Sequence, residues 1–154
     1  MSAHGKAPRF PGLDGLRGMA CYMVIATHVG MRSEGPDAQA YNLSEATAKR
    51  IHERGGLIGL IMAQHQLGKT ADANASRALI NKHLEAIKQA CTDHKASAFG
   101  TDLDGFIKPT IEGVQRAADL SVLAEWILTD HPDDAQDILY GNAQRVFKRV
   151  FEAR

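Results

Sequence analysis

Two side chains in this sequence follow short apolar runs and could bind a metal ion or move a proton. His28 follows the β-prone run at residues 22–27, and Asp102 follows the run at residues 96–101. A neutral imidazole is a good zinc ligand, and a carboxylate can bind a metal or take a proton from metal-bound water. We therefore consider His28 a candidate metal ligand and Asp102 a candidate catalytic residue. Taken alone, a histidine at such a position more often has an ordinary hydrogen-bonding role.

The elements that must position these side chains alternate between strands and helices. Buried strands are predicted at residues 22–27, 57–62 and 96–101, because each run is short and almost wholly apolar. Strands separated by helices form parallel β/α units, so we predict an α/β fold. The carboxyl ends of parallel strands then meet at one edge, where His28 and Asp102 are expected, with Gln64 and His65 after the second strand. Three strands are too few to close a barrel.

The helices of this prediction rest on caps and on apolar spacing. Asn42 is expected to cap a helix that ends near residue 54. A long helix is predicted over residues 76–94, with His83 on its surface. Its buried face is formed by apolar residues at i, i+4, i+7 and i+11, namely Ile80, Leu84, Ile87 and Cys91. Gly141-Asn142 is expected to separate the last two helices. The final helix carries an apolar face suited to docking, formed by Val146, Phe147, Val150 and Phe151.

Composition excludes some functions and suggests a location. Lys plus Arg (18) balance Asp plus Glu (18), so we expect no binding to nucleic acid or to a membrane surface. The two cysteines form no CxxC pair, which favours a reduced, cytoplasmic setting. Residues 1–21 are rich in Gly, Pro and basic residues and are expected to be a leader or mobile arm before a domain at residues 22–154. No apolar run is long enough to span a bilayer.

Five short segments, taken together, carry a more specific pattern. They are VIATH (24–28), YNLS (41–44), RGGLIGL (54–60), GTDLDG (100–105) and GNAQRV (141–146). Their order and spacing resemble the carboxyl-terminal part of the renal dipeptidase (membrane dipeptidase) family of zinc metallopeptidases. The resemblance covers roughly residues 22–152. It implies the carboxyl-terminal portion of a (β/α)8 amidohydrolase-type barrel, with about three β/α units followed by helices.

The resemblance also implies an activity and residue roles. Family members hold two zinc ions and hydrolyse the peptide bond of dipeptides with a metal-activated hydroxide. His28 matches the last metal-ligand histidine of the family, and Asp102 matches the acidic residue that handles the proton of the attacking water. Tyr41 stands where the family has an arginine that binds the substrate carboxylate, and Arg32 in the same loop is a candidate to replace that arginine. The expected substrate is a dipeptide or another small amide.

The sequence departs from the family pattern upstream of residue 22. The His-x-Asp pair, the bridging glutamate and the earlier metal histidine of the family have no counterpart in residues 1–21. Because stable zinc sites use three or four ligands, we expect the zinc site to be incomplete in this chain. A complementing amino-terminal half or a homo-oligomer is the expected partner.

Two rival interpretations remain open. The chain could be a catalytically inactive, truncated remnant that acts as an oligomerising or interaction module, because an open set of strands exposes apolar edges and faces. Residues 12–20 also resemble the start of integral-membrane acyltransferases that modify sugars. That second resemblance is short, and no membrane span follows it.

Overall fold

A small parallel sheet lies at the centre of the molecule. The computed structural model describes residues 29–32 and 42–152. Strand β1 (Ile58–Leu60) pairs in parallel with β2 (Ser97–Phe99). Val29 extends the sheet through a parallel bridge to Leu60, on the side of β1 opposite β2. The order of the parallel segments agrees with the predicted β/α units, and the fold is α/β.

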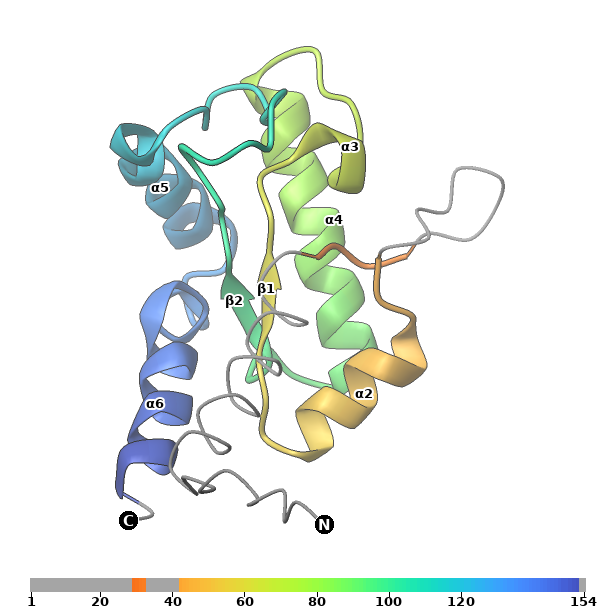
Figure 1. Cartoon of the computed structure of the whole chain (residues 1–154), viewed down its shortest axis with the longest axis vertical. Coiled ribbons are helices and arrows are strands. Elements are labelled where there is room, and N and C mark those ends of the chain that lie inside the picture. Colours follow the sequence, from red (N-terminus) through yellow and green to blue (C-terminus); the bar gives the residue numbers. More distant parts are fainter. Residues whose placement is uncertain (1–28, 33–41, 153–154) are drawn as a thin grey trace, which may run out of the picture.

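Helices surround this sheet, as Figure 1 shows. In the view of Figure 1, α4 lies on one side of the two strands, and α5 and α6 lie on the other. The helical elements in chain order are α2 (Glu45–Glu53), α3 (Gln64–Leu67), α4 (Ala73–Cys91), η1 (Ala117–Asp119), α5 (Leu120–Asp130), η2 (Asp137–Gly141) and α6 (Asn142–Glu152). None of the helices in the described part of the chain is long and apolar enough to span a membrane.

Helix α4 supplies the main apolar face of the core. Its four predicted core residues, Ile80, Leu84, Ile87 and Cys91, are all buried. The side chain of Asp72 caps the helix by accepting a hydrogen bond from the Ala75 backbone N–H at 2.8 Å. The helix ends at Thr92, whose φ of 72° is left-handed. The prediction for this helix is confirmed, although the helix both begins and ends three residues earlier than expected.

Helix α2 begins at a different cap from the one predicted. Ser44, rather than Asn42, is the N-cap, and its hydroxyl accepts from the Thr47 N–H at 3.3 Å. The Asn42 side chain is used in tertiary contacts instead. Its Oδ1 accepts from the Gly30 N–H at 3.0 Å, and its Nδ2 donates to the Gln66 carbonyl at 2.7 Å.

The last two helical elements run into each other without a break. The π-helical turn η2 ends at Gly141 and leads directly into α6, so the predicted start of the last helix at Asn142 is confirmed and the predicted break before it is wrong. The buried Asn142 amide donates to the carbonyls of His94 at 2.8 Å and Ser97 at 3.0 Å, which ties the start of α6 to the amino end of β2.

The apolar face of α6 is not covered as predicted. Phe147 is 39% exposed and Phe151 is 55% exposed, and their rings stack with centroids 6.4 Å apart. The predicted docking of this face is therefore not seen in the described part of the chain. The strand predicted at residues 22–27, the domain boundary at residue 22, His28 and Tyr41 lie outside the described residues.

Candidate functional site

The carboxyl ends of three parallel segments form one edge of the sheet. Val29 pairs with Leu60, and Leu60 pairs with Phe99, so these residues form one row across the sheet. Leu60 and Phe99 are the last residues of β1 and β2. His28 immediately precedes this row in the sequence, and Asp102 follows it by three residues. The edge is therefore where the predicted metal and proton-handling residues are expected.

Asp102 lies in an exposed turn beyond β2. Its φ of 52° is left-handed, which is uncommon for a residue other than glycine. The Asp102 carbonyl accepts from the Gly105 N–H at 3.2 Å and closes the turn. A Cβ at position 105 would lie 2.8 Å from Asp102 Oδ1, so glycine leaves room for the carboxylate. The Asp104 side chain accepts from the Ala117 N–H at 3.1 Å and anchors the turn.

The residues after β1 hold the edge of the sheet in place through hydrogen bonds and are not themselves candidates for metal binding or proton transfer. The backbone N–H of Met62 donates to the Thr101 carbonyl at 3.2 Å and joins the segments beyond the two strands. The Gln64 side-chain amide donates to the Thr110 carbonyl at 2.8 Å, which holds the loop after β2 against α3. His65 is exposed on α3. Gln64 is thus a positioning residue.

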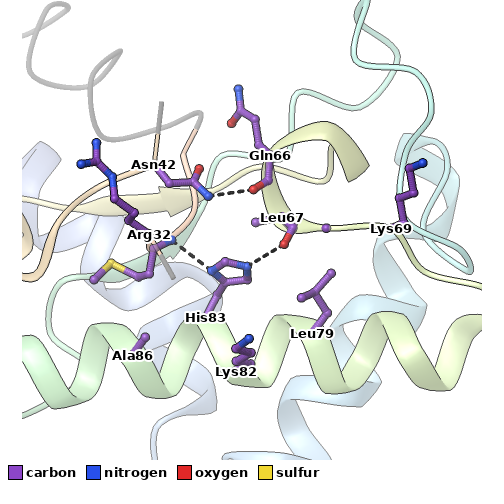
Figure 2. Close-up of a pocket in the computed structure, with 11 residues that line it drawn as sticks. Arg32, Asn42, Gln66, Leu67, Lys69, Leu79, Lys82, His83 and Ala86 are labelled. Atoms are coloured by element: carbon purple, nitrogen blue, oxygen red, sulfur yellow. Dashed lines mark hydrogen bonds between the residues drawn. The ribbon is translucent and has the colours of Figure 1, made fainter. Parts of the chain in front are cut away.

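Arg32 lines a cavity beyond the first segment. Figure 2 shows this cavity, which has a volume of about 520 Å³ and lies between residues 31–32, α3 and α4. Arg32, Lys69 and Lys82 contribute cations, and none of the described lining residues is acidic. Arg32 and Asp102 follow segments on opposite sides of β1, and neighbouring strands are about 4.8 Å apart. These two predicted site residues therefore come from strands that are not adjacent.

His83 fixes the segment that follows His28. Its Nδ1 accepts from the Met31 N–H at 3.0 Å, and its Nε2 donates to the Leu67 carbonyl at 3.2 Å (Figure 2). A backbone N–H only donates and a carbonyl only accepts, so both bonds require neutral imidazole with its proton on Nε2. The prediction that His83 is a surface residue is wrong, because the side chain is buried between α4 and this segment.

We expect His83 to make stability depend on pH. Burial lowers its pKa below 6.5, with the Leu67 bond opposing this shift and Lys82 adding to it. Between the lowered pKa and 6.5 the unfolded chain binds more protons than the folded protein. The free energy of unfolding should therefore fall as pH drops through this window and be fully retained above it.

This prediction is checked by denaturant unfolding between pH 5 and pH 8. The wild-type chain should lose stability below about pH 6.5, and His83→Gln should show a shallower loss. Equal slopes for the two proteins would assign the dependence to other groups.

The sequence predicted the edge of the sheet, but it did not predict the residues whose hydrogen bonds hold the neighbouring segments in place. His83 stands three residues after Ile80 and four before Ile87, so the same helical spacing that predicted the core also places it on the buried face. Asn42 and Asn142 have no comparable local pattern. Asn42 bonds to Gln66, which lies 24 residues away along the chain. Asn142 bonds to Ser97 and His94, which lie 45 and 48 residues away.

The edge fits a metal ion only in part. Asp102 offers a carboxylate there, and His28 is adjacent in sequence to the row of strand ends. Of these two, only His28 is a predicted metal ligand, whereas a zinc site needs three or four ligands. A further group of two histidines and a glutamate in the described residues lies elsewhere, around the amino end of β2.

Comparison with known proteins adds one match. Residues 19–154 match the family model described as membrane dipeptidase (peptidase family M19). The sequence matches none of the curated proteins with which it was compared.

Proposed function

Because this chain belongs to the membrane dipeptidase family (peptidase family M19), a family of dipeptidase-type hydrolases, we propose that it supplies the carboxyl-terminal strand ends of a zinc-dependent dipeptidase site. The observation that supports this proposal is the row formed by Val29, Leu60 and Phe99 across a parallel sheet. His28 precedes this row by one residue in the sequence and Asp102 follows it by three, so we expect both at the same edge. In this proposal, the three parallel segments are the last three strands of a (β/α)8 barrel.

Asp102 handles the proton in this reaction. Zinc, when bound, lowers the pKa of a water molecule and so supplies the nucleophile. The exposed Asp102 carboxylate accepts the proton of that water and passes it to the leaving amine of the dipeptide. The left-handed turn closed by Gly105 presents the carboxylate beyond the strand end. His28 is a metal ligand, and a complementing amino-terminal half provides the remaining ligands.

The substrate carboxylate is bound by the loop after the first segment. Arg32 lies on the wall of a cavity that also has Lys69 and Lys82, and this cationic lining supports binding of an anionic group. Tyr41 contributes a hydroxyl from the same loop. A dipeptide or another small amide is therefore the proposed substrate class.

The first test of this function is the zinc content of the purified chain, measured with its mass in solution before and after dialysis against zinc. His28→Ala is expected to remove the zinc that depends on this edge, because neutral imidazole is one of its few ligands. Dipeptide hydrolysis is measured on the same samples, with and without a complementing amino-terminal half. Equal zinc content and equal hydrolysis in His28→Ala and wild type, both measured with the complementing amino-terminal half, would refute the assignment of His28.

A second candidate function is an inactive interaction module. The stacked and exposed Phe147 and Phe151 on α6 favour it, because paired apolar rings at a surface are typical of contact sites. A stable oligomer without zinc at the strand edge and without hydrolysis would support this alternative. A monomer that hydrolyses dipeptides would exclude it.

A further inference from the structure

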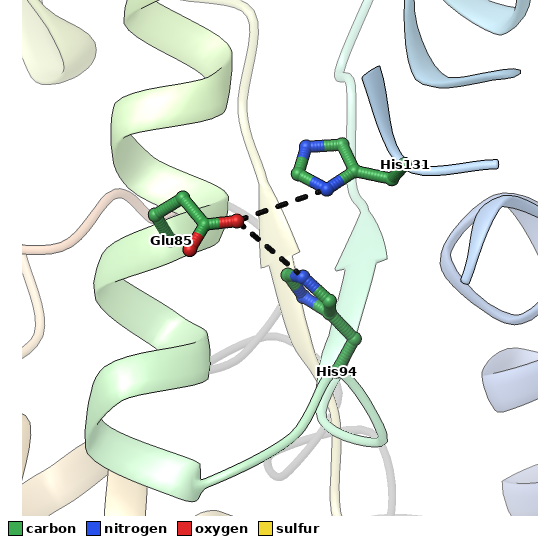
Figure 3. A group of neighbouring side chains, drawn as sticks. All are labelled: Glu85, His94 and His131. Atoms are coloured by element: carbon green, nitrogen blue, oxygen red, sulfur yellow. Dashed lines mark ion pairs between the residues drawn. The ribbon is translucent and has the colours of Figure 1, made fainter. Parts of the chain in front are cut away.

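Two buried histidines and a glutamate come together between α4, the segment before β2 and the end of α5. Figure 3 shows Glu85 on α4, His94 before β2 and His131 after α5. Glu85 Oε1 lies 3.9 Å from His94 Nε2 and 3.8 Å from His131 Nδ1. One ligand atom from each residue lies within 4.8 Å of the other two.

The hydrogen bonds around His131 fix its tautomer. Asp130 accepts a hydrogen bond from Asn81 Nδ2 at 2.5 Å, so the amide oxygen of Asn81 faces the other way. That oxygen lies 3.1 Å from His131 Nε2 and can only accept, which places the imidazole proton on Nε2. The lone pair of neutral His131 is therefore on Nδ1, the atom that faces Glu85. Arg77 forms an ion pair with Asp130 and so fixes the carboxylate to which Asn81 donates.

His94 presents a second nitrogen to the same point. Its Nδ1 lies 3.1 Å from the hydroxyl of the buried Ser97. Its Nε2 faces Glu85 and has no hydrogen-bond partner among the described residues, although the side chain is only 2% exposed. A buried polar atom without a partner costs free energy, and native structures rarely leave one unexplained.

These atoms match the ligand preferences of a transition-metal ion. Zinc binds imidazole nitrogen and carboxylate oxygen at about 2.0–2.2 Å, which places neighbouring ligands of a tetrahedron about 3.4 Å apart. The two distances to Glu85, 3.8 and 3.9 Å, need only a small contraction, and the two imidazole nitrogens lie within 4.8 Å of each other. Glu85 is 48% exposed and can make that adjustment, and its exposure leaves a fourth position open to water. In each histidine the second ring nitrogen faces an oxygen, as is usual for metal-bound imidazoles.

We propose that Glu85, His94 and His131 bind one divalent transition-metal ion, with zinc the preferred ion, at a site that joins α4, the start of β2 and the end of α5. Mixed nitrogen and oxygen ligands select zinc and its neighbours over magnesium or calcium, which prefer sites made only of oxygen. His94 lies before β2 and Asp102 lies after it, so this ion is separate from the zinc proposed for catalysis. The inference therefore does not depend on the proposed function.

The test uses the full chain and titrates it with Zn²⁺ and with Co²⁺ in competition with a chelator. Glu85→Gln removes one ligand at a half-exposed position and is expected to weaken zinc binding by at least about tenfold. Glu125→Gln is the matched control on the exposed part of α5 and should bind zinc as the wild type does. Bound Co²⁺ should show the visible absorption of four-coordinate cobalt in the wild type and lose it in Glu85→Gln.

His28→Ala separates this site from the catalytic one. The proposal expects His28→Ala to keep the zinc that Glu85→Gln loses. Unchanged zinc affinity in Glu85→Gln, loss of all zinc in His28→Ala, or the absence of saturable binding by the wild-type chain would each overturn it. A folding defect in Glu85→Gln would be visible as a lower Tm without metal, and His131→Gln then provides the second variant.

Discussion

Asp102→Asn is expected to lower the rate of dipeptide hydrolysis by about 10²–10⁴-fold and to leave the zinc content unchanged. General acid–base groups contribute rate factors of this size, and asparagine cannot accept the proton of the attacking water. The side chain is exposed in the turn beyond β2, so the substitution should not disturb the core. Asparagine also tolerates the left-handed backbone of this position, where φ is 52°.

The measurement is kcat for a dipeptide, with zinc measured on the same protein after it has been completed by its amino-terminal half. Asp133→Asn, at an exposed position after α5, is the matched control and should keep the wild-type rate. A kcat for Asp102→Asn within a factor of two or so of the wild type would remove Asp102 from the mechanism. Loss of zinc in this variant would make it a ligand instead.

His83→Leu is expected to lower the free energy of unfolding by about 2–6 kcal/mol. The substitution leaves the Met31 N–H and the Leu67 carbonyl without their partner, and each buried group left unsatisfied costs about 1–3 kcal/mol. Such a loss is a large share of the 5–15 kcal/mol that is typical of a domain. Because Met31 lies three residues after His28, the change should also loosen the backbone that carries the proposed metal ligand.

Denaturant unfolding at pH 7.5 measures this effect. His65→Leu is the control, because His65 is exposed on α3 and its replacement should change stability by no more than about 0.5 kcal/mol. Similar stabilities for the two variants would show that the His83 bonds do not stabilise the fold.

The sequence was informative where one periodic pattern determines an element. The spacing of Ile80, Leu84, Ile87 and Cys91 predicted the buried face of α4, and the apolar runs predicted the strands β1 and β2. These patterns arise from burial of one helix face or of a whole strand, so they can be recognised locally. The position of Asp102 after β2 followed from the same strand prediction.

The sequence was less informative where a polar side chain chooses among distant partners. Asn42 and Ser44 are both good N-cap residues, and the choice of Ser44 reflects the contacts of Asn42 with Gly30 and Gln66. Asn142 was correctly interpreted as the start of a helix, but the bonds of its amide to two carbonyls beside β2 were not predicted.

The group around Glu85 was likewise hidden, because tertiary packing alone brings its residues together. Glu85, His94 and His131 come from three elements and have no short spacing of the kind that marks many metal sites. His94 and His131 follow the ends of α4 and α5, and sequence alone does not show that both are buried.

Helix α6 carries a consequence for the order in which the protein forms during synthesis. Arg145 donates to the Gly55 carbonyl at 3.0 Å, across 90 residues of chain, and Arg149 donates to the Arg54 carbonyl at 3.4 Å. The end of α2 therefore gains these partners only after the ribosome has made 90 further residues of chain. Before Arg145 and Arg149 have been synthesised, these carbonyls lack their hydrogen-bond donors and the edge of β2 is not yet covered by α6. An uncovered strand edge can pair with other chains and so promote aggregation. A translation stall before residue 142 should therefore yield an aggregation-prone product.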